Sequence, residues 1–197
     1  MKNNNFYAML SRMKYINRWG LMRNTIKENI AEHSLDTAIL AHALAVIGNA
    51  YFDKNLNAER IAVLAMFHDV TEIITGDMPT PIKYFAPEIK DAYKNVEKYA
   101  GNQLVEILPK EMQNTYRNLI LEQDEEKQYW KYVKAADKLS ALIKCEEELA
   151  MGNVDFAQAG KSTLEAVKNL HLEEADYFLE HFLPAYRLTL DDQAEDV

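Results

Sequence analysis

Two histidines and two aspartates are the residues of this chain best suited to chemistry, and they occur in the order His33, His68–Asp69 and Asp137. Two imidazoles and two carboxylates without a thiolate suit one Mn²⁺, Co²⁺, Fe²⁺ or Ni²⁺ ion, and they are also compatible with Zn²⁺ or Mg²⁺. A single His or Asp in a helix is more often a hydrogen-bonded structural residue than a ligand. The prediction of a metal-dependent hydrolase therefore rests on the whole set.

Each of these residues lies in or beside a segment with helical periodicity. His33 opens a segment in which apolar residues recur at three and four positions. His68 and Asp69 end the run AERIAVLAMFHD, for which Asn57 is a suitable N-cap. Asp137 interrupts the apolar face of YWKYVKAADKLSALIK. The metal site is therefore predicted to lie between helices.

Glu72 follows His68 by four residues and Asp69 by three. If the helix continues, its carboxylate lies over the same face as the ligands, where it could act as a general acid or base on water or the leaving group. The alternative is a solvent-facing helical glutamate.

The other three histidines are interpreted as structural. His42 lies nine residues after His33 and so on the opposite side of the helix. His171 and His181 match no part of the set.

The whole chain reads as all-α. It contains only six Gly and five Pro, and apolar residues recur with helical spacing almost everywhere. We expect helices at about 4–17, from 30 onward, 58–69, 87–108, after Pro109, 124–151, 156–170 and 173–183. The strongest helix-breaking segment is GDMPTP, from Gly76 to Pro81. Residues 1–197 are expected to form one domain, with the metal-site core at about 28–145.

The composition excludes several classes of protein. A formal net charge of −9 argues against binding a nucleic acid polymer, which needs many Lys and Arg contacts. The single Cys145 has no disulfide partner within the chain, which suits a reducing compartment. No apolar run is expected to be long enough to cross a bilayer, and the amino terminus lacks the apolar core of a signal peptide. We therefore expect a cytoplasmic protein without a membrane partner.

Two loops carry further polar candidates. Arg18 has a guanidinium that matches phosphate geometry, and the indole of Trp19 could form a wall beside a sugar or base. From the residues alone, a surface Arg beside a core-anchoring Trp is the better interpretation. Asp77 and Thr80 lie in the proline-stiffened GDMPTP loop, for which a binding role and a plain helix connection are equally consistent with the residues. Weaker phosphate candidates are Arg23, Lys27 and Lys83.

The order His33, His68–Asp69, Asp137 resembles the HD-domain metal-dependent phosphohydrolases. With RMKYINRWGLMRN, ENIAEHSL, FHDVTEIITGDMPTPIK and KAADKLSALIKCEEELAMGN, nearly the whole chain resembles the bacterial HD-domain 5'-deoxynucleotidases. Gly20 departs from the pattern, because a proline is expected after Arg18–Trp19. The resemblance implies hydrolysis of deoxyribonucleoside 5'-monophosphates with one divalent ion. It implies catalytic roles for Glu72, Arg18 and Asp69, and a substrate site formed by Arg18, Trp19, His33, Asp69, Asp77, Met78, Pro79, Thr80 and Asp137.

Two alternatives stay open at this point. The chain could be another HD phosphohydrolase that acts on nucleoside triphosphates, cyclic nucleotides or alarmones. It could instead be a helical module that keeps a metal only for stability, although the complete ligand set with Glu72 argues against this.

We also expect a homodimer, because Tyr129, Trp130 and Tyr132 cannot all share one helical face, so that some of them can pack against a second subunit. For the sugar, we predict that Trp19 closes against the 2' edge while Asp77 accepts a hydrogen bond from the 3'-hydroxyl.

Overall fold

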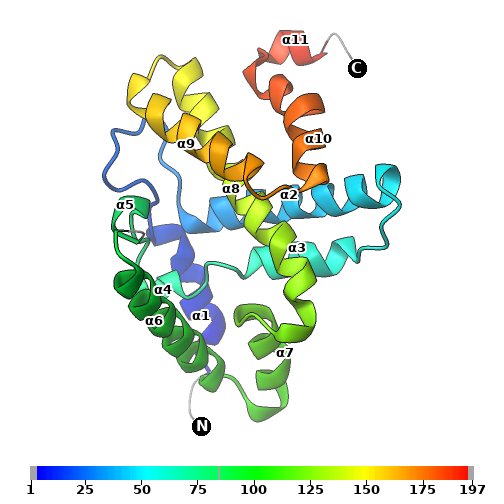
Figure 1. Cartoon of the computed structure of the whole chain (residues 1–197). Helices are drawn as coiled ribbons and strands as arrows, with labels where there is room; N and C mark the ends of the chain where they lie inside the picture. The colour runs from blue at the N-terminus through cyan, green and yellow to red at the C-terminus, as the bar shows by residue number, and fades with distance from the viewer. Residues whose placement is uncertain (1–3, 84, 195–197) are drawn as a thin grey trace.

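The structure is a computed structural model that describes residues 4–83 and 85–194, and within them every regular element is a helix (Figure 1). The all-α prediction is confirmed. The α-helices are α1 Phe6–Leu10, α2 Ile30–Tyr51, α3 Ala58–Met66, α4 Glu72–Thr75, α5 Thr80–Lys83, α6 Pro87–Glu106, α7 Lys110–Ile120, α8 Lys127–Ala150, α9 Ala157–Lys168, α10 Glu173–His181 and α11 Leu190–Ala194. Short 3₁₀ helices are η1 Ser11–Tyr15, η2 Asp124–Glu126, η3 Val154–Phe156 and η4 Leu183–Arg187.

The long helix α2 lies at the centre of the fold and packs against α3 and α8 (Figure 1). Leu44, Ile61 and Leu139, one from each helix, are fully buried in the resulting core. Each such side chain contributes about 1.5–3 kcal/mol through its removal from water. Because His33 belongs to α2 and Asp137 to α8, this packing also fixes the two helices that carry those residues.

Helix α2 is long and apolar enough, by length and composition, to cross a membrane, so the expectation that no such run exists was too strong. A central core helix passes the same test, because it has apolar residues on nearly all sides. In this fold, 56% of the apolar window of α2 is buried against other helices. Packing in the core therefore accounts for its apolar character.

A second, smaller core joins the amino-terminal segment to helices α6 and α7. Phe6, Val70, Leu104 and Ile120 are all buried in it, together with Ile30 at the start of α2. Val70 directly follows the His68–Asp69 pair. This core therefore holds the chain after α3 against the beginning of α2, which brings His68 and Asp69 toward His33.

Several helix boundaries differ from the sequence prediction. The first predicted helix is interrupted, because α1 passes into the 3₁₀ helix η1, and the predicted helix over 124–151 begins with the separate 3₁₀ turn η2. The GDMPTP loop already enters helix α5 at Thr80. Other signals were right: the Asn57 side chain caps α3 by accepting from Arg60 N at 2.9 Å, and Pro87 occupies the first turn of α6.

Trp130 and Tyr132 are buried in the core of the same chain, with exposed fractions of 7% and 0%. Trp130 and Tyr132 are therefore not among the aromatics of α8 that could pack against a second subunit. The Tyr132 hydroxyl donates to Glu174 Oε1 at 3.0 Å, which ties α8 to α10. Cys145 is buried and free, as expected for a structural cysteine.

Candidate active site

His33, His68 and Asp69 meet at the junction of α2 with the turn that follows α3. One ligand atom from each of the three residues lies within 4.8 Å of the other two. The imidazole rings of His33 and His68 have centroids 5.2 Å apart, and Asp69 Oδ2 lies 3.5 Å from His33 Nε2. The predicted sequence pair and its distant histidine are therefore brought together.

The turn after α3 sets the orientation of His68. Helix α3 ends at Met66, and the next residues form tighter bonds, such as His68 N to Ala65 O at 3.3 Å and Val70 N to Phe67 O at 3.3 Å. The prediction that this helix runs through Asp69 is wrong, and the condition that it continue to Glu72 is not met. The turn places His68 Nδ1 2.7 Å from the Ala65 carbonyl, so Nδ1–H donates there and Nε2 is the free ring nitrogen.

That free nitrogen is the best test of whether a metal fits. His68 Nε2 is buried and has no hydrogen-bond partner among the described residues, although Asp69 Oδ2 lies only 3.0 Å away. Two lone pairs at this distance repel unless a positive charge lies between them. Burial disfavours the charged imidazole, but the carboxylates of Asp69 and Asp137 and the bond to the Ala65 carbonyl together raise the pKa of His68. The pair thus attracts a cation, and an Nδ1–H bonded to a backbone carbonyl is typical of metal-binding histidines.

Asp137 completes the predicted set from the side of α8. Its Oδ1 lies 3.2 Å from His33 Nε2, and the Ser140 hydroxyl, one turn later, lies 3.0 Å from His33 Nδ1. Burial raises the pKa of Asp137, but the bond and charge of His33 and the charge of His68 lower it well below its usual range. Asp137 is outside the tight group of three, yet it faces the same imidazole as Asp69.

Glu72 lies beside these residues even though the helix does not continue to it. Its N–H bonds to Asp69 O at 3.0 Å at the start of α4, its side chain is 6% exposed, and its Oε2 is buried without a partner in the described chain. Burial, followed by the charges of Asp69 and Asp77, raises the pKa of Glu72 to about 9. The carboxyl group can therefore hold a proton at neutral pH, and a nearby cation would lower this pKa again.

Arg18 is the main positive charge facing these carboxylates. Its Nη1 donates to Glu28 Oε2 at 2.8 Å, and its Nη2 lies 3.9 Å from Asp137 Oδ1. Burial opposes the charge of the guanidinium, but the carboxylates of Glu28, Asp137, Asp69 and Asp77 raise its pKa above the usual value. Acidic groups therefore outnumber basic groups here, which favours a bound cation in addition to Arg18.

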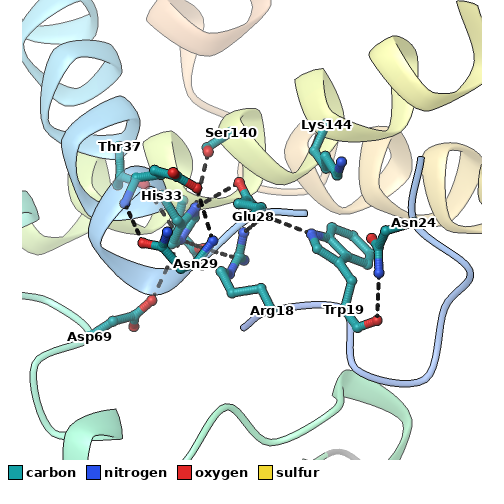
Figure 2. A network of polar contacts seen from close by, with 12 residues as sticks. Arg18, Trp19, Asn24, Glu28, Asn29, His33, Thr37, Asp69, Ser140 and Lys144 are labelled. Atoms are coloured by element: carbon teal, nitrogen blue, oxygen red, sulfur yellow. Dashed lines mark hydrogen bonds and ion pairs between the residues drawn. The ribbon is translucent and has the colours of Figure 1, made fainter. Parts of the chain in front are cut away.

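Trp19 lies next to Arg18, and both side chains point toward Glu28 (Figure 2). The indole Nε1 donates to Glu28 Oε2 at 2.8 Å, and the ring packs against Phe156 with centroids 5.3 Å apart. Trp19 has a positive φ of 59°, whereas Gly20 does not, and a Cβ added at Gly20 would meet open space. The unusual backbone conformation of this loop is therefore at Trp19, and not at Gly20, where the family pattern has a proline.

The GDMPTP loop approaches the same place. Burial raises the pKa of Asp77, and the charge of Asp69 adds to this, although Arg18 and a backbone hydrogen bond from Trp19 act to lower it. Met78 and Pro79 are half-buried. Thr80 begins α5, and its side chain lies outside the described part of the structure. Asp77 is therefore close to both Arg18 and the group of His33, His68 and Asp69.

The three weaker candidates for phosphate binding either form ion pairs with acidic side chains or are exposed to solvent. Arg23 forms two hydrogen bonds with Asp155, at 2.6 and 2.7 Å, and Lys83 donates to Glu97 at 3.0 Å. Lys27 is exposed. The histidines interpreted as structural, His42, His171 and His181, are exposed and outside the metal-binding group.

Glu28 and Ser140 are the site residues that the sequence did not single out. Glu28 contacts Arg18 and Trp19, and Ser140 contacts His33. Asp137 and Ser140 are three residues apart on α8, so their side chains share one face of that helix. That spacing was the available signal for Ser140.

Comparison with known proteins gives a consistent result. Residues 5–186 match the family described as 5'-deoxynucleotidase YfbR-like. The chain is 50% identical over 197 residues to a 5'-deoxynucleotidase of Pectobacterium atrosepticum, covering 100% of this chain and 98% of that protein. It is also 50% identical over 202 residues to the 5'-deoxynucleotidase YfbR of Shigella boydii, with the same coverage.

Solved structures share the fold at lower identity. An HD-domain phosphohydrolase from Listeria innocua has a TM-score of 0.82 and 22% identity, covering 96% of this chain and 92% of that one. The HD phosphohydrolase of cyanophage S-2L, solved with dA and one catalytic Zn²⁺ ion, has a TM-score of 0.66 and 20% identity, covering 90% and 95%. The fold is thus that of these HD-domain proteins. The resemblance to the 5'-deoxynucleotidases is confirmed, and the chain belongs to the YfbR-like 5'-deoxynucleotidase family.

Proposed function

We propose that this chain hydrolyses deoxyribonucleoside 5'-monophosphates to the deoxyribonucleoside and inorganic phosphate, using one divalent metal ion. The reaction class follows from full-length similarity to proteins named 5'-deoxynucleotidases. The observation in the structure that carries the proposal is the group of His33, His68 and Asp69, in which His68 Nε2 is buried without a partner among the described residues.

We propose His33, His68, Asp69 and Asp137 as the metal ligands. When bound, a divalent ion such as Mn²⁺ or Co²⁺ activates water and neutralises phosphate charge. Carboxylate and imidazole ligands alone do not select one of these metals, and Zn²⁺ is also compatible with the set. Asp137 is the ligand nearest to Arg18 Nη2, at 3.9 Å. A phosphate near Asp137 would therefore also be within reach of the guanidinium.

The remaining chemistry is assigned to two side chains. Arg18 binds the phosphate oxygens and orients the phosphorus for in-line attack by water. Glu72 transfers protons, either from the attacking water or to the 5' oxygen as the phosphorus–oxygen bond breaks, because its carboxyl group is buried beside Asp69. Asp69 contributes through its position beside both imidazoles.

Substrate profiling tests this function directly. With Mn²⁺ or Co²⁺, we expect phosphate release from dAMP and other deoxyribonucleoside monophosphates, and little from dATP, cyclic AMP or alarmones. Protein freed of metal by a chelator serves as the control and should be inactive until the ion returns. Preferred release from a triphosphate or a cyclic nucleotide would replace this function with another phosphohydrolase activity.

The sugar preference is assigned to Trp19 and Asp77. We propose that the indole leaves no room or partner for a 2'-hydroxyl, while Asp77 accepts a hydrogen bond from the 3'-hydroxyl. Met78, Pro79 and Thr80 are proposed to line the nucleotide. A buried hydroxyl without a partner costs about 1–3 kcal/mol, which corresponds to roughly 5- to 150-fold discrimination.

Trp19→Ala is expected to raise the ratio of AMP to dAMP kcat/KM, because the wall that excludes the 2'-hydroxyl is lost. Arg18→Ala should lower kcat/KM for AMP and for dAMP by the same factor, because both nucleotides present the same phosphate. Steady-state kinetics on this matched pair measures both effects. An unchanged ratio in Trp19→Ala refutes the steric account, and a changed ratio in Arg18→Ala shows that the two roles are divided wrongly.

We further propose that the protein acts in the cytoplasm as a homodimer. Support for the dimer comes from α2, where Leu35, Ile39 and Val46 recur on its exposed side with exposed fractions of 55%, 60% and 45%. Light scattering on the purified protein measures the oligomeric state.

A further inference from the structure

Glu28 lies where the two ends of the loop over residues 18–28 are joined. An isolated antiparallel bridge pairs Asn17 with Asn29, and Arg18 N donates to Glu28 O at 2.9 Å. Directly after it, Asn29 caps α2 in a capping box with Glu32. The backbone of Glu28 is therefore fixed from both sides, and its side chain is nearly buried, with an exposed fraction of 9%.

One oxygen atom of Glu28 accepts hydrogen bonds from both of the residues proposed to bind the phosphate and the sugar. Oε2 accepts from Arg18 Nη1 and from Trp19 Nε1, each at 2.8 Å, and Oε1 lies 4.0 Å from His33 Nδ1 (Figure 2). The guanidinium held in this way directs Nη2 toward Asp137, 3.9 Å away. The relative position of the guanidinium and the indole is thus set by a single carboxylate.

Trp19 needs such a restraint. Its φ of 59° lies in the left-handed region that residues with a side chain rarely adopt. The ring is held by the indole N–H bond to Glu28, by packing against Phe156 and by the Arg18 guanidinium, whose Cζ lies 5.7 Å from the ring centroid. Without the bond to Glu28, the ring keeps the packing against Phe156 and the contact with Arg18, whose guanidinium is itself held by Glu28.

We infer that Glu28 is a specificity-determining positioning residue, which fixes Trp19 against the sugar while holding Arg18 at the phosphate. This inference rests on the proposed function. Glu28 contacts no substrate atom in this assignment and acts only through its two donors. Its loss should therefore change the choice between deoxyribose and ribose, and not only the stability of the loop.

The first test compares Glu28→Ala with Glu28→Gln on dAMP and AMP. We expect Glu28→Ala to lower the dAMP preference in kcat/KM about tenfold, equivalent to about 1.4 kcal/mol, with a larger change in KM for dAMP than in kcat. Glu28→Gln should restore most of the preference, because its amide oxygen can still accept both N–H groups. A preference within twofold of the wild type in Glu28→Ala overturns the inference, as does failure of Glu28→Gln to restore it.

Glu126→Gln is the matched control. Glu126 also accepts two hydrogen bonds from one arginine, Arg60, each at 2.7 Å, but this pair joins α3 to η2 away from the loop. Its substitution should lower the denaturation midpoint and leave the dAMP preference unchanged. An equal loss of preference in Glu126→Gln would show that general destabilisation is responsible, and would overturn the inference.

A double-mutant cycle with Trp19→Phe identifies the path of the effect. Phenylalanine keeps an aromatic ring but removes the indole N–H. If Glu28 acts through this bond, the effects of Glu28→Ala and Trp19→Phe on the preference are not additive, whereas full additivity contradicts the inference.

Acrylamide quenching of tryptophan fluorescence gives a readout that does not need turnover. The second tryptophan, Trp130, is only 7% exposed, so a change in quenching reports on Trp19. Glu28→Ala should increase quenching, and unchanged quenching overturns the inference. If the wild type failed to hydrolyse dAMP, the proposed function would fail separately, while this measurement would still decide whether Glu28 positions the indole.

Discussion

Asp69→Ala is expected to abolish turnover and to lower the metal content of the purified protein. Asp69 Oδ2 lies 3.0 Å from His68 Nε2 and 3.5 Å from His33 Nε2, so it faces both imidazoles of the proposed site. Its removal takes away the negative charge that offsets a divalent cation between two neutral rings. Metal analysis by mass spectrometry and phosphate release from dAMP measure the two effects.

Two comparisons make this result specific. His68→Ala should behave in the same way, because it removes the buried nitrogen that has no partner among the described residues. Asp91→Ala, an exposed aspartate on α6, should keep both metal and activity. Full metal occupancy with near-normal turnover in Asp69→Ala would show that the ligand assignment is wrong.

Glu72→Ala should separate catalysis from metal binding. We expect the variant to keep its fold and metal but to lose about 10²- to 10⁴-fold in kcat, the usual contribution of a general acid or base. The physical reason is the environment of Glu72, where burial and the charges of Asp69 and Asp77 raise its pKa to about 9. A cation bound nearby would lower this pKa, so the carboxyl group can take up a proton from water as well as supply one to the leaving oxygen.

Glu72→Gln sharpens the comparison, because glutamine keeps the size and the hydrogen-bonding capacity of the side chain but has no acidic proton. It should lose as much kcat as Glu72→Ala. Measurements of kcat under saturating dAMP, with metal content determined on the same samples, decide the matter. If Glu72→Gln retained kcat within about threefold of the wild type, Glu72 would have only a structural role.

The sequence predicted those parts of the fold and site that depend on local patterns. Asn57 and Pro87 marked helix starts correctly, because capping and proline geometry act within one turn. Helical spacing correctly placed His33 and Asp137 in two separate helices. The end of α3 at Met66 was missed, because the following residues form tight turns that are stabilised by burial of Val70 in a distant core.

Glu28 shows a different limit of sequence analysis. Its role depends on the pairing of Asn17 with Asn29, which joins two segments across a loop without regular structure. Neither hydrophobic periodicity nor a motif describes such a loop. Glu72 was identified for an incorrect reason, since it reaches the site through the start of α4 and not through a continuous helix.

The partners of His33 have a consequence for how the site forms during synthesis. Asp137 and Ser140 are 104 and 107 residues away from it along the chain. A nascent chain that emerges from the ribosome amino terminus first has both histidines and Asp69 long before α8 exists. During that interval the incomplete ligand group lacks the carboxylate and hydroxyl of α8. The proposed ligand set is therefore completed late, when α8 docks onto α2.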